Sequence, residues 1–171
     1  MQATDLVCHD ILKRLIAFDT TSRNSNLPLI EWVKDYLAGF GVESVLTYDD
    51  EGQKANLFAT LGPADRSGGV ILSGHTDVVP VDGQDWVTDP FDMLEKDGRL
   101  YGRGTCDMKS FVAVSLAMVP QFLERQLTVP IHLAFSYDEE VGCIGVRRLI
   151  DGNLSKGIRP QACIVGEPTN M

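Results

Sequence analysis

Four side chains in the sequence have the chemistry of ligands for divalent metal ions, namely His75, Asp107, Glu140 and Glu167. Imidazole nitrogens and carboxylate oxygens bind divalent cations, and the ligands of one ion need only converge in space, whatever their separation along the chain. A paired metal site formed by such ligands lowers the pKa of a bound water and holds the resulting hydroxide near a carbonyl group. The function therefore depends on whether the fold brings these side chains together.

Each candidate ligand also has an ordinary structural explanation. A lone histidine after a strand, such as His75, is more often a hydrogen-bonded structural residue, and Asp107 could simply cap the helix that follows it. Glu139 and Glu140 would by default form a solvated acidic turn, and Glu167 could be only a loop residue. No one of these residues alone indicates a metal site.

The elements that must position these side chains begin with three short apolar segments typical of buried strands. The segments are Gly69–Gly74, Pro130–Ser136 and Ala162–Val165, and candidate ligands follow each of them. Strands and helices alternate along the chain, which favours a layered α/β domain with a largely parallel central sheet. Ligands of open α/β sheets bind at the carboxyl ends of the strands, so the candidate side chains are expected to converge on one site.

The other elements follow from hydrophobic periodicity and from the glycine and proline positions. Helices are expected over 7–16, 26–38, 109–125 and 143–150, and further strands over 42–48 and 56–61. Pro120 should bend or interrupt the third of these helices, because proline removes a backbone donor and clashes with the preceding turn. Residues 81–102 are rich in Asp, Gly and Pro and are expected to form a long loop with a hairpin around Asp97 and Gly98.

Composition excludes some classes of function. The formal net charge of −9 argues against general nucleic-acid binding, because phosphate contacts need clustered Lys and Arg. The N-terminus lacks a signal-peptide pattern and no apolar run approaches the roughly 20 residues that span a bilayer, so a cytoplasmic protein is expected. The scattered cysteines are expected to be reduced, small core residues. They are Cys8, Cys106, Cys143 and Cys163.

The local sequences around the candidate ligands resemble a known family. They are SGHTDVVP at 73–80, GRGTCDMK at 102–109, YDEEVG at 137–142 and VGEPT at 165–169. In order and approximate separation they are similar to the metal-site segments of the dizinc metallopeptidase family that includes acetylornithine deacetylase, succinyl-diaminopimelate desuccinylase, aminoacylase and carboxypeptidase G. The resemblance covers nearly the whole chain. The segments PVDGQDW at 80–86, DPF at 89–91 and FSYDEEVGCIG at 135–145 look most like the acetylornithine deacetylase branch.

The resemblance implies a three-layer α/β sandwich and a role for each residue of the site. His75 and Glu167 would bind one ion, Glu140 the other, and Asp107 would bridge the two. The ions would be zinc, with cobalt as the alternative. Asp77 would accept the second imidazole N–H of the histidine and fix its tautomer. Glu139 would be the general base and acid. The resemblance also implies a cis peptide bond after Asp107.

The implied reaction is removal of the acetyl group from N-acetylornithine, a step of arginine biosynthesis, with a small N-acyl amino acid as substrate and a homodimer as the full-length protein. A desuccinylase, a dipeptidase or an aminoacylase of the same family is the alternative within hydrolases. A truncated, non-catalytic metal-binding module is the alternative from another class. A nucleotide-binding domain fits poorly, because the chain has no G-x-G-x-x-G or Walker sequence.

The chain departs from the family pattern in two respects. Cys106 and Ser110 stand where relatives resembling this chain usually have Ala and Gly, and Cys106 is expected to be a tolerated small residue. The family's last metal ligand is a histidine far downstream, which neither His9 nor His132 matches. Residues 1–171 are therefore expected to be the N-terminal portion of a catalytic domain, without the lid and dimerisation domain or the C-terminal remainder, and to be inactive alone.

Overall fold

The computed structural model of the chain describes residues 3–152 and 157–169. Its helices are α1 (Ala3–Ile16), α2 (Leu27–Ala38), α3 (Lys109–Ala117), α4 (Val119–Glu124) and α5 (Ile144–Gly152). Its strands are β1 (Ser44–Tyr48), β2 (Ala55–Leu61), β3 (Val70–His75), β4 (Leu94–Lys96), β5 (Arg99–Tyr101), β6 (Ile131–Ser136) and β7 (Ala162–Val165).

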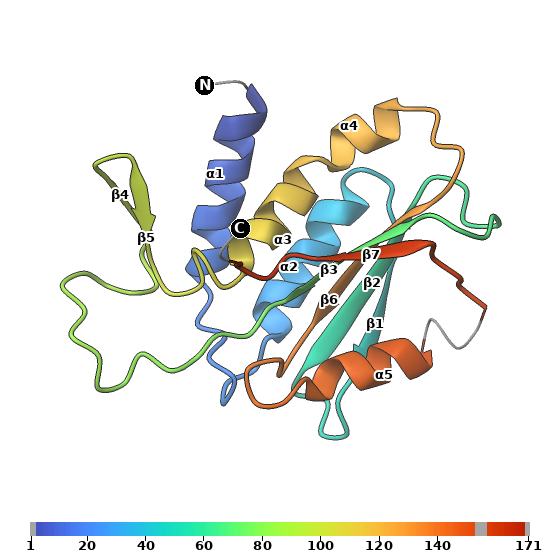
Figure 1. The fold of residues 1–171 in the computed structure, drawn as a ribbon. Coiled ribbons are helices and arrows are strands. Elements are labelled where there is room, and N and C mark those ends of the chain that lie inside the picture. Colours follow the sequence, from blue (N-terminus) through green and yellow to red (C-terminus); the bar gives the residue numbers. More distant parts are fainter. Residues whose placement is uncertain (1–2, 153–156, 170–171) are drawn as a thin grey trace.

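Within the described residues a five-stranded sheet has the order β1-β2-β6-β3-β7. Strand β2 is antiparallel to both of its neighbours, and β3 is parallel to β6 and to β7. All strands of this sheet except β2 therefore run in the same direction. Helices α1 to α4 cover one face and α5 lies on the other (Figure 1), which confirms the predicted α/β sandwich with a largely parallel sheet.

Apolar side chains fill the space on both faces of the sheet. On the first face Leu29, Ile30, Val33 and Leu37 recur on one side of α2 and are all buried. They belong to a large core cluster with residues of α1, α3, β2 and β6. On the second face a smaller cluster includes Leu149 of α5. Burial of both faces explains why β2 and β6 are almost continuously apolar.

Strands β3 and β6 end side by side, because their register pairs His75 with Ser136. Strand β7 lies on the other side of β3, and the N–H of Gly166 just after it donates to the carbonyl of Ser73. The segments that follow these three strands therefore leave the same edge of the sheet. A loop and the β4–β5 hairpin project away from the sheet beside α1 (Figure 1). This hairpin confirms the turn predicted at Asp97 and Gly98.

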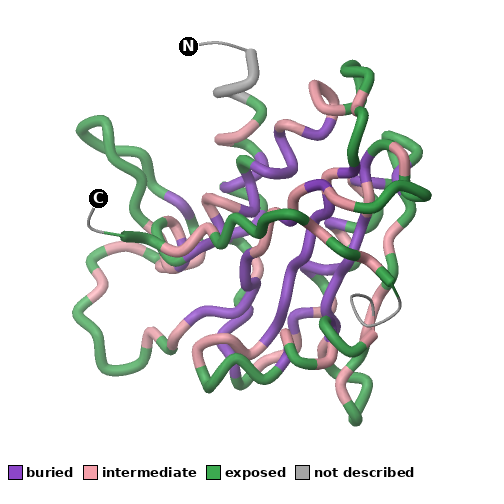
Figure 2. The backbone as a smooth tube through the Cα atoms, turned by 45° about the vertical axis from the view of Figure 1, so that its right-hand side comes forward, coloured by how far each residue is buried: buried purple, intermediate pink, exposed green. Residues whose placement is uncertain are grey.

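Strand β7 has the predicted bounds, but the prediction that it is buried was wrong. All of its residues are exposed, and Ile164 retains 51% of its accessible surface. Among the described residues β7 is the last strand of the sheet, so no strand pairs with its outer side. Figure 2 shows it as an exposed segment in front of the buried strands.

The prediction that the cysteines are core residues was also wrong. Cys106, Cys143 and Cys163 are exposed and Cys8 is half-buried. Cys163 is exposed because it lies in β7, and the other two exposed cysteines lie in turns beside helices. The predicted helix over 109–125 is two helices, and Pro120 is near the start of the second, as expected of a residue that interrupts a helix. No helix in the described part of the chain is long and apolar enough to cross a bilayer.

Lys109 joins the first helix to the segment that carries Asp107. Its side chain is only 1% exposed, and Nζ donates hydrogen bonds to the carbonyls of Leu15 (3.0 Å) and Phe18 (2.8 Å) at the end of α1. Burial lowers the pKa of Lys109 to about 7, although the charges of Asp19 and Asp77 oppose this shift. The ammonium group thus satisfies carbonyls that a helix end leaves without an intrahelical donor.

We expect Lys109→Met to lower the free energy of unfolding by about 2–4 kcal/mol, because the carbonyl of Phe18 loses the ammonium donor and that of Leu15 keeps only the N–H of Phe18 at 3.3 Å. Urea denaturation measures this change. Lys34→Met on the exposed side of α2 is the matched control and should stay within about 0.5 kcal/mol of the original protein. Equal stabilities of the two variants would contradict the anchoring role of Lys109.

Candidate metal centre

His75 is the last residue of β3 and is 2% exposed. Its Nδ1 lies 2.8 Å from the carbonyl oxygen of Asp77, so Nδ1 must be the donor in this hydrogen bond. Its backbone N–H donates to the sulfur of Met108 at 3.3 Å. These contacts fix the ring, and in the neutral imidazole they leave the lone pair on Nε2, which is the atom that a metal ion would need.

Carboxylates surround this nitrogen. The distances from His75 Nε2 are 3.0 Å to Asp107 Oδ1, 3.7 Å to Glu167 Oε1 and 3.9 Å to Glu139 Oε2. Within the described residues, ligand atoms lie within 4.8 Å of one another in two sets, one of His75, Glu139 and Glu167 and one of His75, Asp107 and Glu140. The structure thus brings all four candidate ligands together, from the ends of three strands and from the loop before α3.

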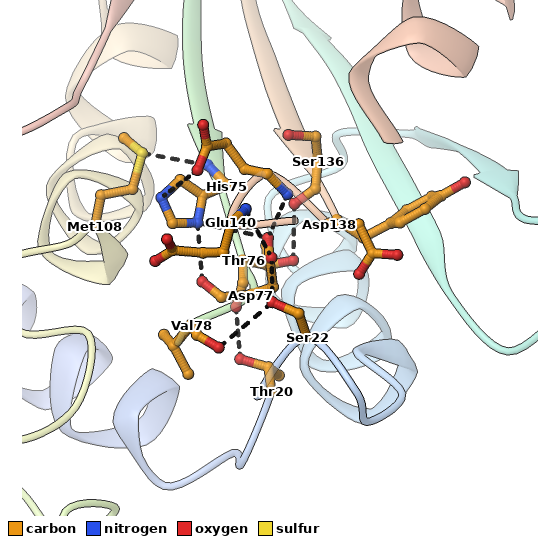
Figure 3. Close-up of polar contacts among 12 residues, drawn as sticks. Thr20, Ser22, His75, Thr76, Asp77, Val78, Met108, Ser136, Asp138 and Glu140 are labelled. Atoms are coloured by element: carbon orange, nitrogen blue, oxygen red, sulfur yellow. Dashed lines mark hydrogen bonds and ion pairs between the residues drawn. The ribbon is translucent and has the colours of Figure 1, made fainter. Parts of the chain in front are cut away.

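Asp77 lies on the other side of the imidazole ring, as Figure 3 shows. Its carboxylate Oδ1 is 3.5 Å from Nδ1 of His75, farther than its own carbonyl oxygen, which accepts the imidazole N–H. The carboxylate instead accepts the backbone N–H groups of Glu139 (3.0 Å) and Glu140 (3.3 Å) and the hydroxyl of Ser22 (2.7 Å). Asp77 therefore orients His75 mainly through its main chain and holds the acidic turn through its side chain.

The clustered charges shift the pKa values of the site. Burial by itself lowers the pKa of His75, but the carboxylate of Asp77 and the charge of Glu167 outweigh it and raise this pKa to about 9. Burial and then the neighbouring negative charges raise the pKa values of Glu140 and Glu167. Like charges this close repel each other, and a divalent cation among them would remove the repulsion. The set of donors thus fits a metal ion.

Glu139 lies at the edge of this cluster and is 34% exposed. Its carboxylate also accepts the thiol S–H of Cys143, with 3.3 Å between Sγ and Oε1. His75, Glu139, Cys143 and Glu167 line one cavity of about 250 Å³ between β3, β7 and the start of α5. Three surface hollows of the described chain are larger, at about 270, 390 and 400 Å³, but they contain none of the clustered donors.

The remaining histidines and Cys106 lie outside the cluster. His132 is buried in β6, where Nδ1 is 2.9 Å from the hydroxyl of Thr60 and the ring stacks on Phe58. His9 lies on α1, 3.4 Å from a carboxylate oxygen of Glu95. In the described residues Cys106 belongs to neither set of donors. The Asp107–Met108 peptide bond is cis, which confirms the expectation from the resemblance.

Sequence reasoning missed the residues that support the acidic turn. Lys54 pairs with Asp138, and Ser22 bonds to Asp77, across 84 and 55 residues of sequence. Lys54 lies just before β2, and Ser22 lies in the connection after α1. Their partners depend on the paths of loops, and no periodic pattern in the sequence points to them. The structure therefore extends the candidate site beyond the ligands themselves.

The chain is similar to known hydrolases. Residues 71–171 match the model of Peptidase family M20/M25/M40. The acetylornithine deacetylase of Pasteurella multocida (strain Pm70) is 40% identical over 148 residues, which are 86% of this chain and 37% of that protein. That of Myxococcus xanthus is 41% identical over 164 residues, 94% of this chain and 41% of that protein. The chain thus spans about two fifths of the length of these curated relatives.

Solved structures share the fold. Human carnosine dipeptidase 1 superposes with a TM-score of 0.78 at 24% identity, over 96% of this chain and 40% of that one. An M20 family metallo-carboxypeptidase from Sulfolobus solfataricus gives a TM-score of 0.79 at 21% identity, over 97% of this chain and 37% of that one. At this level of identity the likeness concerns the fold alone.

We expect metal binding at pH 6.5–7.5 to release a proton, because His75, with a pKa of about 9, must become neutral before Nε2 can bind an ion. The affinity for zinc should therefore rise by about tenfold for each unit of pH. Isothermal titration in two buffers with different ionisation enthalpies counts the released protons.

His75→Ala is the negative control for this titration and should lose the tight binding. His132→Gln is the matched control, because it changes a buried histidine in a neighbouring strand that takes no part in the cluster. Zinc binding without proton release, or unchanged binding by His75→Ala, would contradict the assignment of Nε2 as a ligand.

Proposed function

The chain belongs to Peptidase family M20/M25/M40, and on this basis we propose that it is part of a metal-dependent amidohydrolase that removes the acetyl group from N-acetylornithine. The observation that carries the proposal is the convergence of Asp107, Glu139, Glu140 and Glu167 around Nε2 of one buried histidine. The family implies the use of divalent metal ions, and this donor set fits them.

In the proposed site His75 and Glu167 would hold one ion, Glu140 would hold the other, and Asp107 would be a ligand shared by both. Zinc ions, or cobalt in their place, would supply Lewis acidity that lowers the pKa of water and polarises the amide carbonyl. The protein's own contribution is to fix the ligands. Nδ1 of His75 is held by the carbonyl of Asp77 at 2.8 Å, so Nε2 remains directed at the carboxylates.

Glu139 is the proposed general base and acid. It takes a proton from the attacking water as the new C–O bond forms, and it returns the proton to the nitrogen when the amide C–N bond breaks. Acetate and ornithine are the products. Three features suit this carboxylate to the role: it is partly exposed, it lines the cavity, and its main chain is fixed by Asp77.

The substrate is proposed from the relatives, since several proteins named acetylornithine deacetylase are 37–41% identical to this chain. A cytoplasmic location, a place in arginine biosynthesis and a homodimeric complete protein belong to the same proposal. The proposal also assigns residues 1–171 to the N-terminal portion of the catalytic domain. The lid and dimerisation domain and the last histidine ligand would be supplied elsewhere in the complete protein.

A substrate panel on the complete gene product, loaded with zinc or cobalt, tests the proposal. N-acetylornithine should be hydrolysed faster than N-succinyl-diaminopimelate, N-acetylmethionine or a dipeptide. Faster cleavage of one of the other three would assign the protein to a sister activity within the family. Bound metal with no turnover of any of them would favour a non-catalytic metal-binding protein.

Glu139→Gln should lower kcat by about 10²–10⁴-fold, because the amide cannot accept the proton that the carboxylate takes. Bound metal, measured by elemental analysis of the same sample, should be retained. Glu43→Gln changes an exposed glutamate just before β1 in the same way and should leave kcat unaltered. Activity of Glu139→Gln close to that of the original protein would exclude Glu139 as the base.

A further inference from the structure

Residues distant in sequence hold the turn that carries Glu139 and Glu140 through hydrogen bonds and an ion pair. Asp138 opens this turn with φ of 52°, in the left-handed region that few residue types other than glycine adopt readily. Asp is among those that tolerate it, but a residue held there needs support from its surroundings. The support for Asp138 is an ion pair.

Lys54 supplies the other half of this pair. Its Nζ lies 2.5 Å from Oδ1 of Asp138, and the two side chains are only 16% and 14% exposed. Solvent and salt screen an ion pair this buried only weakly, and removal of one side chain leaves the other as an uncompensated buried charge. The pair therefore fixes the position of Asp138, which directly precedes Glu139 in the chain.

The same ammonium group reaches the turn by a second route. Nζ of Lys54 also donates to the carbonyl of Ser22 at 2.5 Å, and the hydroxyl of Ser22 donates to Oδ2 of Asp77 at 2.7 Å. The carboxylate of Asp77 in turn accepts the N–H groups of Glu139 and Glu140. Figure 3 shows Ser22 below Asp77, and Asp138 to the right of Glu140. Lys54 thus holds both the start of the turn and the residue that binds its amides.

The backbone of Lys54 is itself well fixed. Its N–H donates to Oδ1 of Asp49 at 3.1 Å, in the turn between β1 and β2. The next residue, Ala55, is bonded on both sides by the side chain of Asn26, at 2.9 Å in each case. Because the stem of the lysine begins at a rigid point, its ammonium group can determine the position of the turn.

We propose that Lys54 is a positioning residue for the general base and for a metal ligand: through Asp138 and Ser22 it sets where the turn presents the carboxylates of Glu139 and Glu140. The proposal rests on the function proposed above for these two glutamates. Lys54 acts through the two groups that its ammonium contacts, the carboxylate of Asp138 and the carbonyl of Ser22.

The test uses Lys54→Met and Asp138→Asn in the complete gene product loaded with cobalt. Asparagine tolerates a positive φ, so Asp138→Asn removes the charge and keeps the backbone conformation available. Each variant should lower kcat by about 10–100-fold, as is typical when residues that orient metal ligands are changed. KM should change by less than about twofold, because the binding of substrate is left intact.

The double variant and the conservative variant separate positioning from general stability. Lys54→Met with Asp138→Asn should be no slower than either single variant, because both break the same pair. Lys54→Arg should recover most of kcat, since it restores a cation at this point. The absorption spectrum of bound cobalt should change in Lys54→Met and return in Lys54→Arg, whereas a purely structural role would alter only the denaturation midpoint.

Arg148→Met is the matched control, because Arg148 of α5 pairs with Asp50 in the same β1–β2 connection, but in a more exposed position. Its kcat and cobalt spectrum should be unaltered. Unchanged kcat and cobalt spectrum in Lys54→Met, or effects of the two single variants that add fully, would overturn the proposal. If the complete protein hydrolyses none of the panel substrates, the proposed function fails, while the cobalt spectrum and affinity still decide the role of Lys54.

Discussion

The main physical constraint on this structure is the repulsion among carboxylates that meet around one buried imidazole. Asp107, Glu139 and Glu167 each place an oxygen within 3.9 Å of Nε2 of His75, and Glu140 completes the cluster. Such a gathering is unfavourable without a cation among the carboxylates, and burial together with the neighbouring negative charges raises the pKa values of Glu140 and Glu167. Divalent cations are the counter-charge best matched to imidazole and carboxylate donors, so this electrostatic cost is itself the main physical argument for a metal centre.

A rigid frame is needed to hold such a cluster together. The parallel strands β3, β6 and β7 bring the segments that follow them to one edge of the sheet. Asp77 then links two of these segments, because it holds the ring of His75 through its carbonyl and the acidic turn through its carboxylate. Lys109 and Lys54, both largely removed from solvent, join the surrounding loops to the N-terminal part of the chain. These contacts together hold in place the segments that carry the candidate ligands.

The sequence allowed prediction of most of the fold because its strands are apolar and its breaks are marked by glycine and proline. The four candidate ligands could be predicted because His75 ends a strand, Glu140 and Glu167 follow strands and Asp107 precedes a helix, and because the sequences around them resemble a metallopeptidase family. The exposure of β7 could not be predicted, since an apolar strand has the same composition in the middle of a sheet and at its edge. The hydrogen-bond partners of Asp77 could not be predicted either, because they depend on how two loops approach each other. Lys54 and Asp138 meet across 84 residues, and nothing local in the sequence marks them as a pair.

The most direct measurement of the central claim is anomalous diffraction from crystals of the zinc-loaded protein, recorded on both sides of the zinc absorption edge. Peaks beside Nε2 of His75 and among the carboxylates of Asp107, Glu140 and Glu167 are the predicted result. Zinc bound only elsewhere on the surface, with these carboxylates turned away from one another, would contradict the assignment of a metal centre.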